Sequence, residues 1–217
     1  MKKDNNNLFW ISYSDIMTSL FFIMLVLFVV TVSFYYGQFQ ASQEKLDEIR
    51  NIETALSSLD RDYFNFDEES KRYRLNIPVE FHPNDDNIHV AGEGILDDLY
   101  DAGRSLYSRL DSLLEVNEQA HLLLVIEGNT QRFGNNYLNY PDVGYELSYN
   151  RALSLYNYWK EDRALDFRDL TDRYDGRFEL IIAGSGYFGL NREEDGSPLN
   201  RRFTLQITSK YTLEADT

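Results

Sequence analysis

The feature that most constrains this chain is a long apolar run near its N-terminus. Residues Ile16–Tyr36 include no charged side chain, and these 21 residues are enough for a helix that crosses a bilayer, which needs about 20. The apolar region of a cleavable signal peptide is shorter, about 7–15 residues, and is followed by small residues. This run ends instead in Ser33-Phe34-Tyr35-Tyr36, so we expect a retained membrane anchor. Lys2 and Lys3 precede it and favour a cytoplasmic N-terminus.

Charge is divided unevenly along the chain. The formal net charge is −15, yet Asp15 is the only charged residue between Asn5 and Gln43. The acidic remainder disfavours direct nucleic-acid binding, because phosphates require a basic surface. The absence of Cys excludes disulfides, thiolate metal sites and a Cys nucleophile. The three His residues belong to no recognisable catalytic motif, so we expect no enzyme activity, metal or cofactor.

Asp15 lies near the start of the apolar stretch, where a carboxylate is costly. Placing an acid at the centre of a membrane helix costs about 2.5–3.5 kcal/mol on insertion scales, so such residues usually face a bundle interior or a water path. Ser12, Thr18 and Ser19 fall with Asp15 in a helical sector of about 120°. Two interpretations remain open. Asp15 is either an interfacial acid at the helix N-terminus, favoured by the helix dipole, or a carboxylate that binds and releases a cation in a pore.

The segment around Asp15 has a recognisable pattern. Residues 9–20 read Phe-Trp-Ile-Ser-Tyr-Ser-Asp-Ile-Met-Thr-Ser-Leu and are followed by aliphatic residues. This segment resembles the transmembrane helix of the MotB family of stator subunits, and most closely that of ZorB from the Zorya anti-phage system. The resemblance implies a homodimer whose two helices lie inside a pentameric MotA- or ZorA-like membrane partner. It also implies that Asp15 carries H⁺ or Na⁺ while Ser12, Thr18 and Ser19 line the path.

A helical connector is expected after the membrane segment. Apolar residues recur at helical spacing from Gln38 to Leu59, which fits a short coiled coil or an ordinary packed helix. Residues 60–74 are highly charged and are predicted to be a solvated connector. The predicted organisation is a cytoplasmic tail at 1–7, a transmembrane helix at 8–37, a helical, plug-like connector at 38–72 and a folded domain at 73–217.

The folded domain is predicted to be an α/β sandwich, which makes the whole chain α+β. Alternating or continuous apolar patterns predict strands, and helical periodicity predicts helices. The order β-α-β-α-β-β indicates helices on one face of a mixed sheet. The expected strands are 73–81, 122–126, 178–183 and 203–207, and the expected helices are 95–114 and 147–159.

Three pieces of this domain resemble OmpA-like peptidoglycan-binding domains. They are Val125–Gln131, Leu147–Ala152, which fits the L-S-x-x-R-A helix start of that family, and Asn200–Leu205. The resemblance implies that Arg151 binds a carboxylate of the peptidoglycan stem, with Leu147 packed beside it. It places Thr130 and Gln131 across the same site.

Two positions depart from the OmpA-like pattern. Gln131 stands where the family has an acid, and Gly144 stands where it has Asn. The residues alone leave a second interpretation of Arg151 open, a surface arginine that pairs with Glu146 or Asp142.

One further motif has a simpler explanation. Gly184–Gly189 fits G-x-G-x-x-G, but a polar loop follows it rather than the helix that phosphate binding requires, so we expect a turn.

The sequence therefore predicts a stator subunit in the bacterial inner membrane, with a periplasmic domain that binds peptidoglycan and a role in Zorya-type defence. A flagellar MotB-like subunit is one alternative. The other is a passive tether without ion transport.

Overall fold

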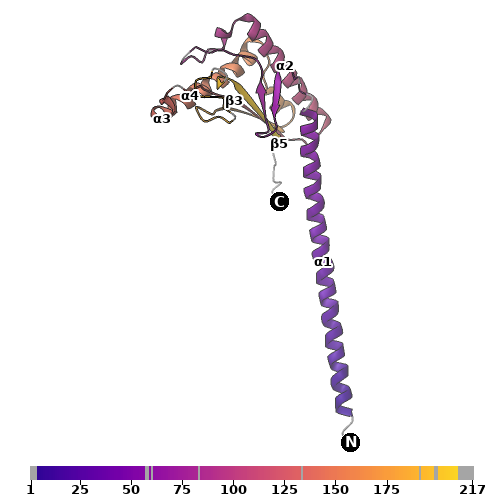
Figure 1. Ribbon diagram of the computed structural model, residues 1–217. Coiled ribbons are helices and arrows are strands. Elements are labelled where there is room, and N and C mark those ends of the chain that lie inside the picture. The colour runs from indigo at the N-terminus through magenta and orange to yellow at the C-terminus, as the bar shows by residue number, and fades with distance from the viewer. Residues whose placement is uncertain are drawn as a thin grey trace. The chain divides into compact units, whose positions relative to one another are not determined.

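The computed structural model describes residues 4–56, 59, 61–82, 84–132, 134–190, 192–197 and 200–209. The chain divides into two compact units, Met1–Arg50 and Asn51–Thr217 (Figure 1). The second unit is called the globular unit below. The predicted α+β class is confirmed, since a long apolar helix precedes a mixed five-stranded sheet with helices.

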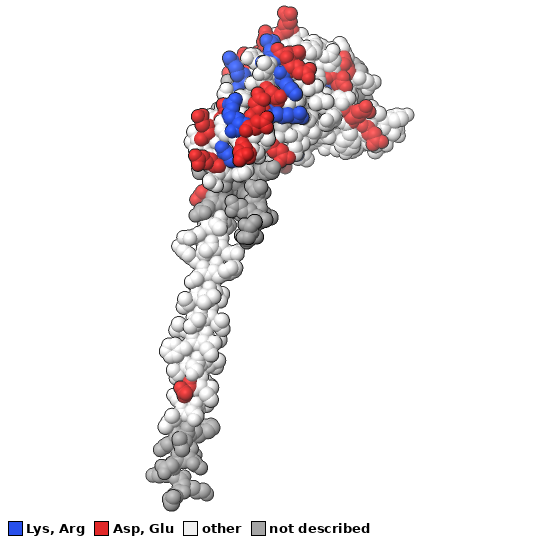
Figure 2. Space-filling model, turned by 180° about the vertical axis from the view of Figure 1, so that it is seen from behind, with Lys and Arg blue, Asp and Glu red and all other residues white. Residues whose placement is uncertain are grey.

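The first unit is helical throughout its described part. Helix α1 begins at Asp4 and ends at Leu56, inside the globular unit. Its segment Trp10–Gln43 has a mean hydropathy of 2.6 and is long and apolar enough to cross a membrane. The Thr18 and Thr31 hydroxyls each donate to the carbonyl oxygen four residues earlier, at 2.7 Å, so these polar groups are satisfied within the helix. Figure 2 shows the contrast between the nearly uncharged helix and the many acidic and basic side chains of the globular unit.

The sheet of the globular unit has the strand order β1-β2-β5-β3-β4. Only β3 and β4 are parallel, and the other neighbours are antiparallel, as a mixed sheet requires. The strands are β1 Phe64–Asp67, β2 Arg72–Leu75, β3 Leu122–Gly128, β4 Phe178–Gly184 and β5 Phe203–Ser209.

Three of the four predicted strands have their expected places, and the first is shorter than expected. Strand β2 ends at Leu75, whereas the alternation of apolar residues predicted a strand to Phe81. Pro78 has no N–H to give to a ladder, and residues 78–82 lie outside any strand. Val79 and Phe81 are nevertheless buried, so the alternation reflects an extended segment packed on the core.

The prediction of a solvated connector at 60–74 is wrong. Strands β1 and β2 form an antiparallel hairpin there, and Phe64 and Tyr73 are buried in the core. This segment has few apolar residues among many charged ones, so its composition did not indicate the two strands. The globular unit accordingly begins at Asn51 rather than at the expected boundary, residue 73. The buried side chains of Ile52 and Leu56 show that the end of α1 packs as an ordinary core helix.

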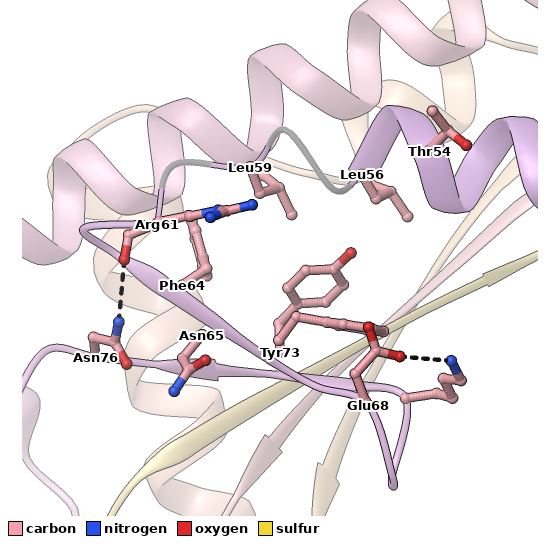
Figure 3. A pocket seen from close by; sticks show the side chains of 11 residues that line it. Thr54, Leu56, Leu59, Arg61, Phe64, Asn65, Glu68, Tyr73 and Asn76 are labelled. Carbon is pink, nitrogen blue, oxygen red and sulfur yellow. Dashed lines mark hydrogen bonds and ion pairs between the residues drawn. The ribbon is translucent and has the colours of Figure 1, made fainter.

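A pocket of about 720 Å³ lies beside this hairpin (Figure 3). Leu56, Phe64 and Tyr73 are among the apolar side chains that line it. Its rim carries an exposed ion pair of 3.0 Å between Lys71 and Glu68. None of the predicted site residues lines this pocket.

Helices cover one face of the sheet. The side chains of β3 alternate between buried and half-buried, as expected when one face holds the core. Trp159 is fully buried and donates from Nε1 to the carbonyl oxygen of Leu99 at 2.8 Å. The helices are η1 Ile88–Ala91, α2 Glu93–Val116, α3 Asn136–Asn139, α4 Pro141–Asn157, the π-helical turn η2 Tyr158–Asp162 and α5 Asp169–Arg173.

Asp67 holds the β1–β2 turn and should make it sensitive to acid. Its Oδ1 accepts hydrogen bonds from the backbone N–H groups of Ser70 at 2.9 Å and Glu69 at 3.0 Å. The bond from Ser70 is the largest of the causes that lower the pKa of Asp67. A depressed pKa means that this stabilisation is complete above the unfolded pKa of about 3.9 and is lost as the pH falls through the folded pKa.

We therefore expect Asp67→Asn to speed amide hydrogen exchange in β1 and β2 at pH 6. The difference from the unsubstituted chain should shrink as the pH approaches 3. Glu68→Gln is the matched control, because the Glu68 side chain lies in the same turn, is 81% exposed and forms an exposed ion pair with Lys71. Equal exchange rates in the two variants at pH 6 would contradict the role of Asp67.

Candidate functional site

The predicted ion-carrying residues lie on one exposed stretch of α1. Asp15, Ser12, Thr18 and Ser19 are all exposed along this helix. The Asp15 carboxylate makes no hydrogen bond or ion pair within the part of the chain that the structure describes. Thr18 already donates to the Ser14 carbonyl. The helix therefore presents one carboxylate with unused acceptor capacity on an otherwise uncharged surface.

Glycines bring α4 against the ends of the central strands. A Cβ on Gly128 would lie 2.0 Å from the carbonyl oxygen of Ser148, and one on Gly184 would lie 2.4 Å from Ser148 Oγ. Only a residue without a side chain fits such approaches. Ser148 is fully buried, donates to the Tyr145 carbonyl at 2.9 Å and accepts from the Gly186 N–H at 2.9 Å. This contact fixes the part of α4 that carries the predicted binding residues.

Arg151 lies one turn beyond Ser148 and is buried, with 3% of its surface exposed. Its Nε donates to the carbonyl oxygen of Asp85 at 3.0 Å, and Nη2 donates to that of His82 at 3.5 Å. The guanidinium lies 4.6 Å from the ring centroid of Phe81. Burial, with a smaller contribution from nearby Arg201, lowers the pKa of Arg151 to about 10. The interpretation of Arg151 as a surface residue that pairs with Glu146 or Asp142 is therefore wrong.

Gln131 is linked to Arg151 through one more arginine. Gln131 Oε1 accepts from Arg201 Nε at 2.7 Å, and Arg201 Nη1 donates to the Phe81 carbonyl at 2.9 Å. The amide nitrogen of Gln131 donates to the carbonyl of Gly196. The structure thus connects Gln131 to Arg151 through Arg201 and Phe81. An acid at position 131 would form an ion pair with Arg201, whereas the neutral amide of Gln131 forms a hydrogen bond to it.

Thr130 and Leu147, the other two predicted binding residues, are not exposed. Thr130 is 1% exposed, and its Oγ1 is buried without a hydrogen-bond partner in the described residues. Leu147 is half-buried on α4. Gly144 stands where the OmpA-like pattern has Asn. A residue with a side chain does not fit at this position, because a Cβ there would lie 2.3 Å from the ring of Tyr187.

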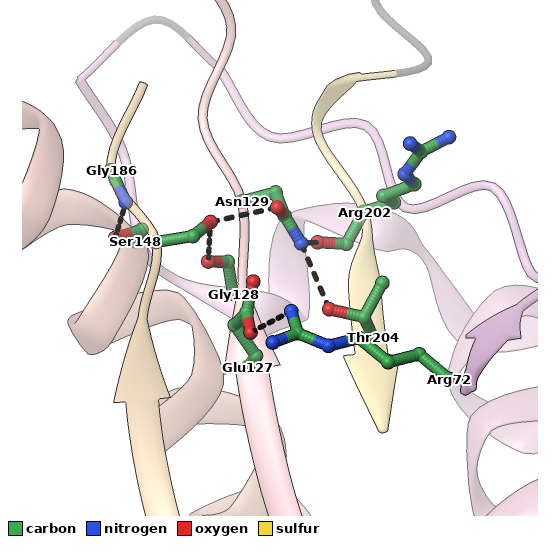
Figure 4. A network of polar contacts seen from close by, with 9 residues as sticks. Arg72, Glu127, Gly128, Asn129, Ser148, Gly186, Arg202 and Thr204 are labelled. Atoms are coloured by element: carbon green, nitrogen blue, oxygen red, sulfur yellow. Dashed lines mark hydrogen bonds and ion pairs between the residues drawn. The ribbon is translucent and has the colours of Figure 1, made fainter. Parts of the chain in front are cut away.

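A polar network that the sequence did not reveal joins the strand ends near this site (Figure 4). Asn129 Nδ2 donates to Thr204 Oγ1 at 3.2 Å and to the Arg202 carbonyl at 3.3 Å, while Oδ1 accepts from Ser185 Oγ at 2.7 Å. Beside it, Arg72 and Glu127 form an ion pair of 2.6 Å across the sheet. These contacts tie β3, β5 and the loop after β4 together, and so hold Thr130 and Gln131 in place. Asn129 directly follows Gly128 in the strand-end motif, which is the one signal that pointed to it.

The predicted turn at Gly184–Gly189 is confirmed, since no helix follows β4 in residues 185–190. Among the described residues, no group of three or more His, Asp and Glu side chains is placed to hold a metal ion. The chemistry that the arrangement offers is charge and hydrogen bonding, supplied by Asp15 in α1 and by arginines in the globular unit.

Comparisons with known proteins give distant structural matches only. No protein-family model and no curated protein matches the chain. Solved structures that match include a periplasmic domain of MotB, at 12% identity and a TM-score of 0.37, which covers 64% of each chain. A MotB-like protein from Desulfovibrio vulgaris matches at 12% identity and a TM-score of 0.40, covering 79% of this chain and 95% of that one.

The periplasmic domain of Helicobacter pylori MotB matches at 12% identity and a TM-score of 0.34, over 64% of this chain and 84% of that one. This chain therefore spans less than two thirds of the first of these structures. At such identities and TM-scores, the likeness does not decide the family of the chain.

Proposed function

We propose that this chain is a single-pass stator subunit of an ion-driven rotary motor of the MotB and ZorB kind, with its N-terminus in the cytoplasm and its globular unit in the periplasm. The observation that carries the proposal is one carboxylate, Asp15, on an uncharged helix of membrane length, within the Phe9–Leu20 pattern. A lone acid in such a helix is retained at a cost in insertion free energy, which favours a role in ion movement.

The proposed mechanism follows from the electrostatics of the membrane. Asp15 binds H⁺ or Na⁺ from one side and releases it to the other, and Ser12, Thr18 and Ser19 supply oxygen atoms along the path. Moving one elementary charge across 100 mV releases about 2.3 kcal/mol, and repeated steps accumulate enough energy to turn a ring of partner subunits. We propose that two copies of α1 lie inside a pentameric partner of the MotA or ZorA type.

A motor delivers torque only if one part is held still, and the globular unit is proposed to bind peptidoglycan for this purpose. Arg151 supplies a planar fork of N–H donors that matches a carboxylate. Two of its five N–H donors are occupied by the carbonyls of Asp85 and His82, so we propose that the other three bind the carboxylate.

We expect Arg151→Lys to weaken binding to purified peptidoglycan sacculi by about tenfold, because an ammonium keeps the charge but cannot form the bidentate pair. Co-sedimentation of the full chain in detergent measures this. Arg104→Lys is the matched control, since the Arg104 side chain is 63% exposed on α2. Unchanged binding by Arg151→Lys, with unchanged thermal unfolding, would remove Arg151 from the wall site.

The resemblance of the Phe9–Leu20 segment to ZorB favours anti-phage defence over motility. Phage plating on cells with the native gene neighbourhood, compared with cells lacking only this chain, tests the choice. Loss of protection on deletion supports the defence role. Unchanged plating together with lost swimming would support the flagellar alternative.

A further inference from the structure

An exposed aromatic surface surrounds Arg132 on the globular unit. Tyr145 and Phe188 are 46% and 47% exposed, and their ring centroids are 6.0 Å apart at an interplanar angle of 31°. The guanidinium of Arg132 lies 4.6 Å from the ring centroid of Tyr137 and 5.5 Å from that of Phe188. We call these four residues the aromatic face. Exposed aromatic side chains that lie together, rather than singly, are typical of a binding site.

The aromatic face is held in position by contacts beneath it. Arg132 Nε donates to the Tyr187 carbonyl at 2.9 Å, and the buried Tyr187 ring packs against Gly144 at the start of α4. In Figure 1, α3 and α4, which carry Tyr137 and Tyr145, lie side by side. Tyr137 and Tyr145 therefore stand on packed helices, and the backbone N–H of Phe188 donates to the Ser185 carbonyl at 3.0 Å. Little conformational entropy is lost when a ligand orders these rings further.

Arginine N–H groups near the aromatic face have donor capacity left. Arg132 Nη1 lies 3.7 Å from Asp195 Oδ1, which is longer than a direct hydrogen bond. Arg192 Nη1 donates to the Thr130 carbonyl at 2.9 Å, while its Nε and Nη2 have no hydrogen-bond partner in the described residues. Burial and the neighbouring Arg132 lower the pKa of Arg192. The donor capacity left on Arg132 suits an acceptor-rich ligand.

The aromatic face is joined to the proposed wall site through Tyr187. The Tyr187 carbonyl accepts from Arg132, and the Tyr187 ring lies against Gly144 at the start of α4, the helix that carries Arg151. A peptidoglycan strand carries its stem peptides on alternate sugars. A strand whose stem peptide reaches Arg151 must therefore lay its sugar rings on the adjoining surface.

We propose that the aromatic face binds the glycan strand of peptidoglycan, with sugar rings stacked on Phe188, Tyr145 and Tyr137. Arg132 donates to the carboxylate, acetamide and hydroxyl oxygens of the sugars. This inference rests on the proposed wall-binding function and extends it from the stem peptide to the polysaccharide. Flat rings offer large contact area at low entropy cost, and the guanidinium adds directional hydrogen bonds.

Glycan strands stripped of their stem peptides by an amidase provide the test. The full chain in detergent should bind these strands, and the double substitution Tyr145→Ser with Phe188→Ser should weaken binding at least tenfold. Val116→Ser is the matched control, because Val116 is 83% exposed but belongs to the end of α2 that leads into the start of β3. Its affinity should change less than twofold. Arg151→Lys should spare the stripped strands while it weakens binding to intact sacculi.

Other outcomes would overturn the proposal and are distinguishable from each other. If intact sacculi bind but stripped strands do not, the wall is held through the stem peptide alone. If the double variant keeps full affinity for the strands but changes from dimer to monomer by sedimentation velocity, the aromatic face is a contact between copies of this chain. If the unsubstituted chain binds neither sacculi nor strands, the wall-binding part of the proposed function fails as well.

Discussion

Cells that carry Asp15→Asn are expected to lose phage protection completely and to plate phage like cells that lack the chain. Asn keeps the size and hydrogen-bonding capacity of Asp but removes the group that binds and releases a cation. The substitution also lowers the cost of membrane insertion, so a loss of protein is not the expected cause. Plating efficiency at matched protein levels measures the effect. Asp15→Glu keeps the carboxylate and should retain part of the protection.

The matched control for this substitution is Asp101→Asn, the same change on the surface of α2, where Asp101 forms an exposed pair with Arg104. It should leave protection unchanged. Full protection by Asp15→Asn would instead identify Asp15 as an interfacial acid and the chain as a passive wall tether.

Gly128→Ala is expected to give the largest loss of stability among small substitutions in the globular unit. The added methyl group would lie 2.0 Å from the carbonyl oxygen of Ser148 and 3.2 Å from the backbone nitrogen of Ala152. Both are backbone atoms of α4, which cannot move away as a flexible side chain can. Overpacking of this kind costs about 1–3 kcal/mol and occasionally more. Urea unfolding followed by tryptophan fluorescence is a suitable measurement, since Trp159 is fully buried in this unit.

Gly94→Ala is the control for Gly128→Ala. Gly94 lies in the first turn of α2, and a Cβ there would meet nothing within 4 Å. Alanine in a helix is favoured over glycine by about 0.5–1 kcal/mol, so this variant should be slightly more stable than the unsubstituted chain. If Gly128→Ala unfolded at the same urea concentration as Gly94→Ala, the close approach of α4 to β3 would not be a constraint.

Periodicity predicted the elements whose apolar residues form a clear pattern. The seven residues of β3 alternate in burial, and Leu99, Leu106 and Leu110 of α2 are fully buried at the spacing of a helical face. Such patterns show which face of a helix or strand is buried, and they can be recognised within a short stretch of sequence. The apolar run of α1 was predictable for the same reason.

The remaining features depend on contacts between residues that are far apart in the sequence. Strand β1 is four residues long, and it forms by pairing with β2. The burial of Arg151 follows from the carbonyls of His82 and Asp85, which lie more than 60 positions earlier in the chain. Nothing in the local pattern around Arg151 shows that these two carbonyls accept hydrogen bonds from it.

The aromatic face could not be predicted either. Tyr137, Tyr145 and Phe188 come from α3, α4 and the loop after β4, so only the fold brings them around Arg132. Tyrosines in a sequence do not distinguish a core from a surface. The exposed fractions of these rings supply that information.

Ion flow through the assembled complex tests the proposed role of Asp15 most directly. The chain would be purified together with its proposed membrane partner and reconstituted into liposomes that contain a pH-sensitive or a sodium-sensitive dye. With an imposed membrane potential, we expect the unsubstituted complex to conduct H⁺, or Na⁺ when that ion is supplied, and the Asp15→Asn complex to conduct neither. Equal ion flow through both complexes would contradict the proposal that Asp15 carries the ion.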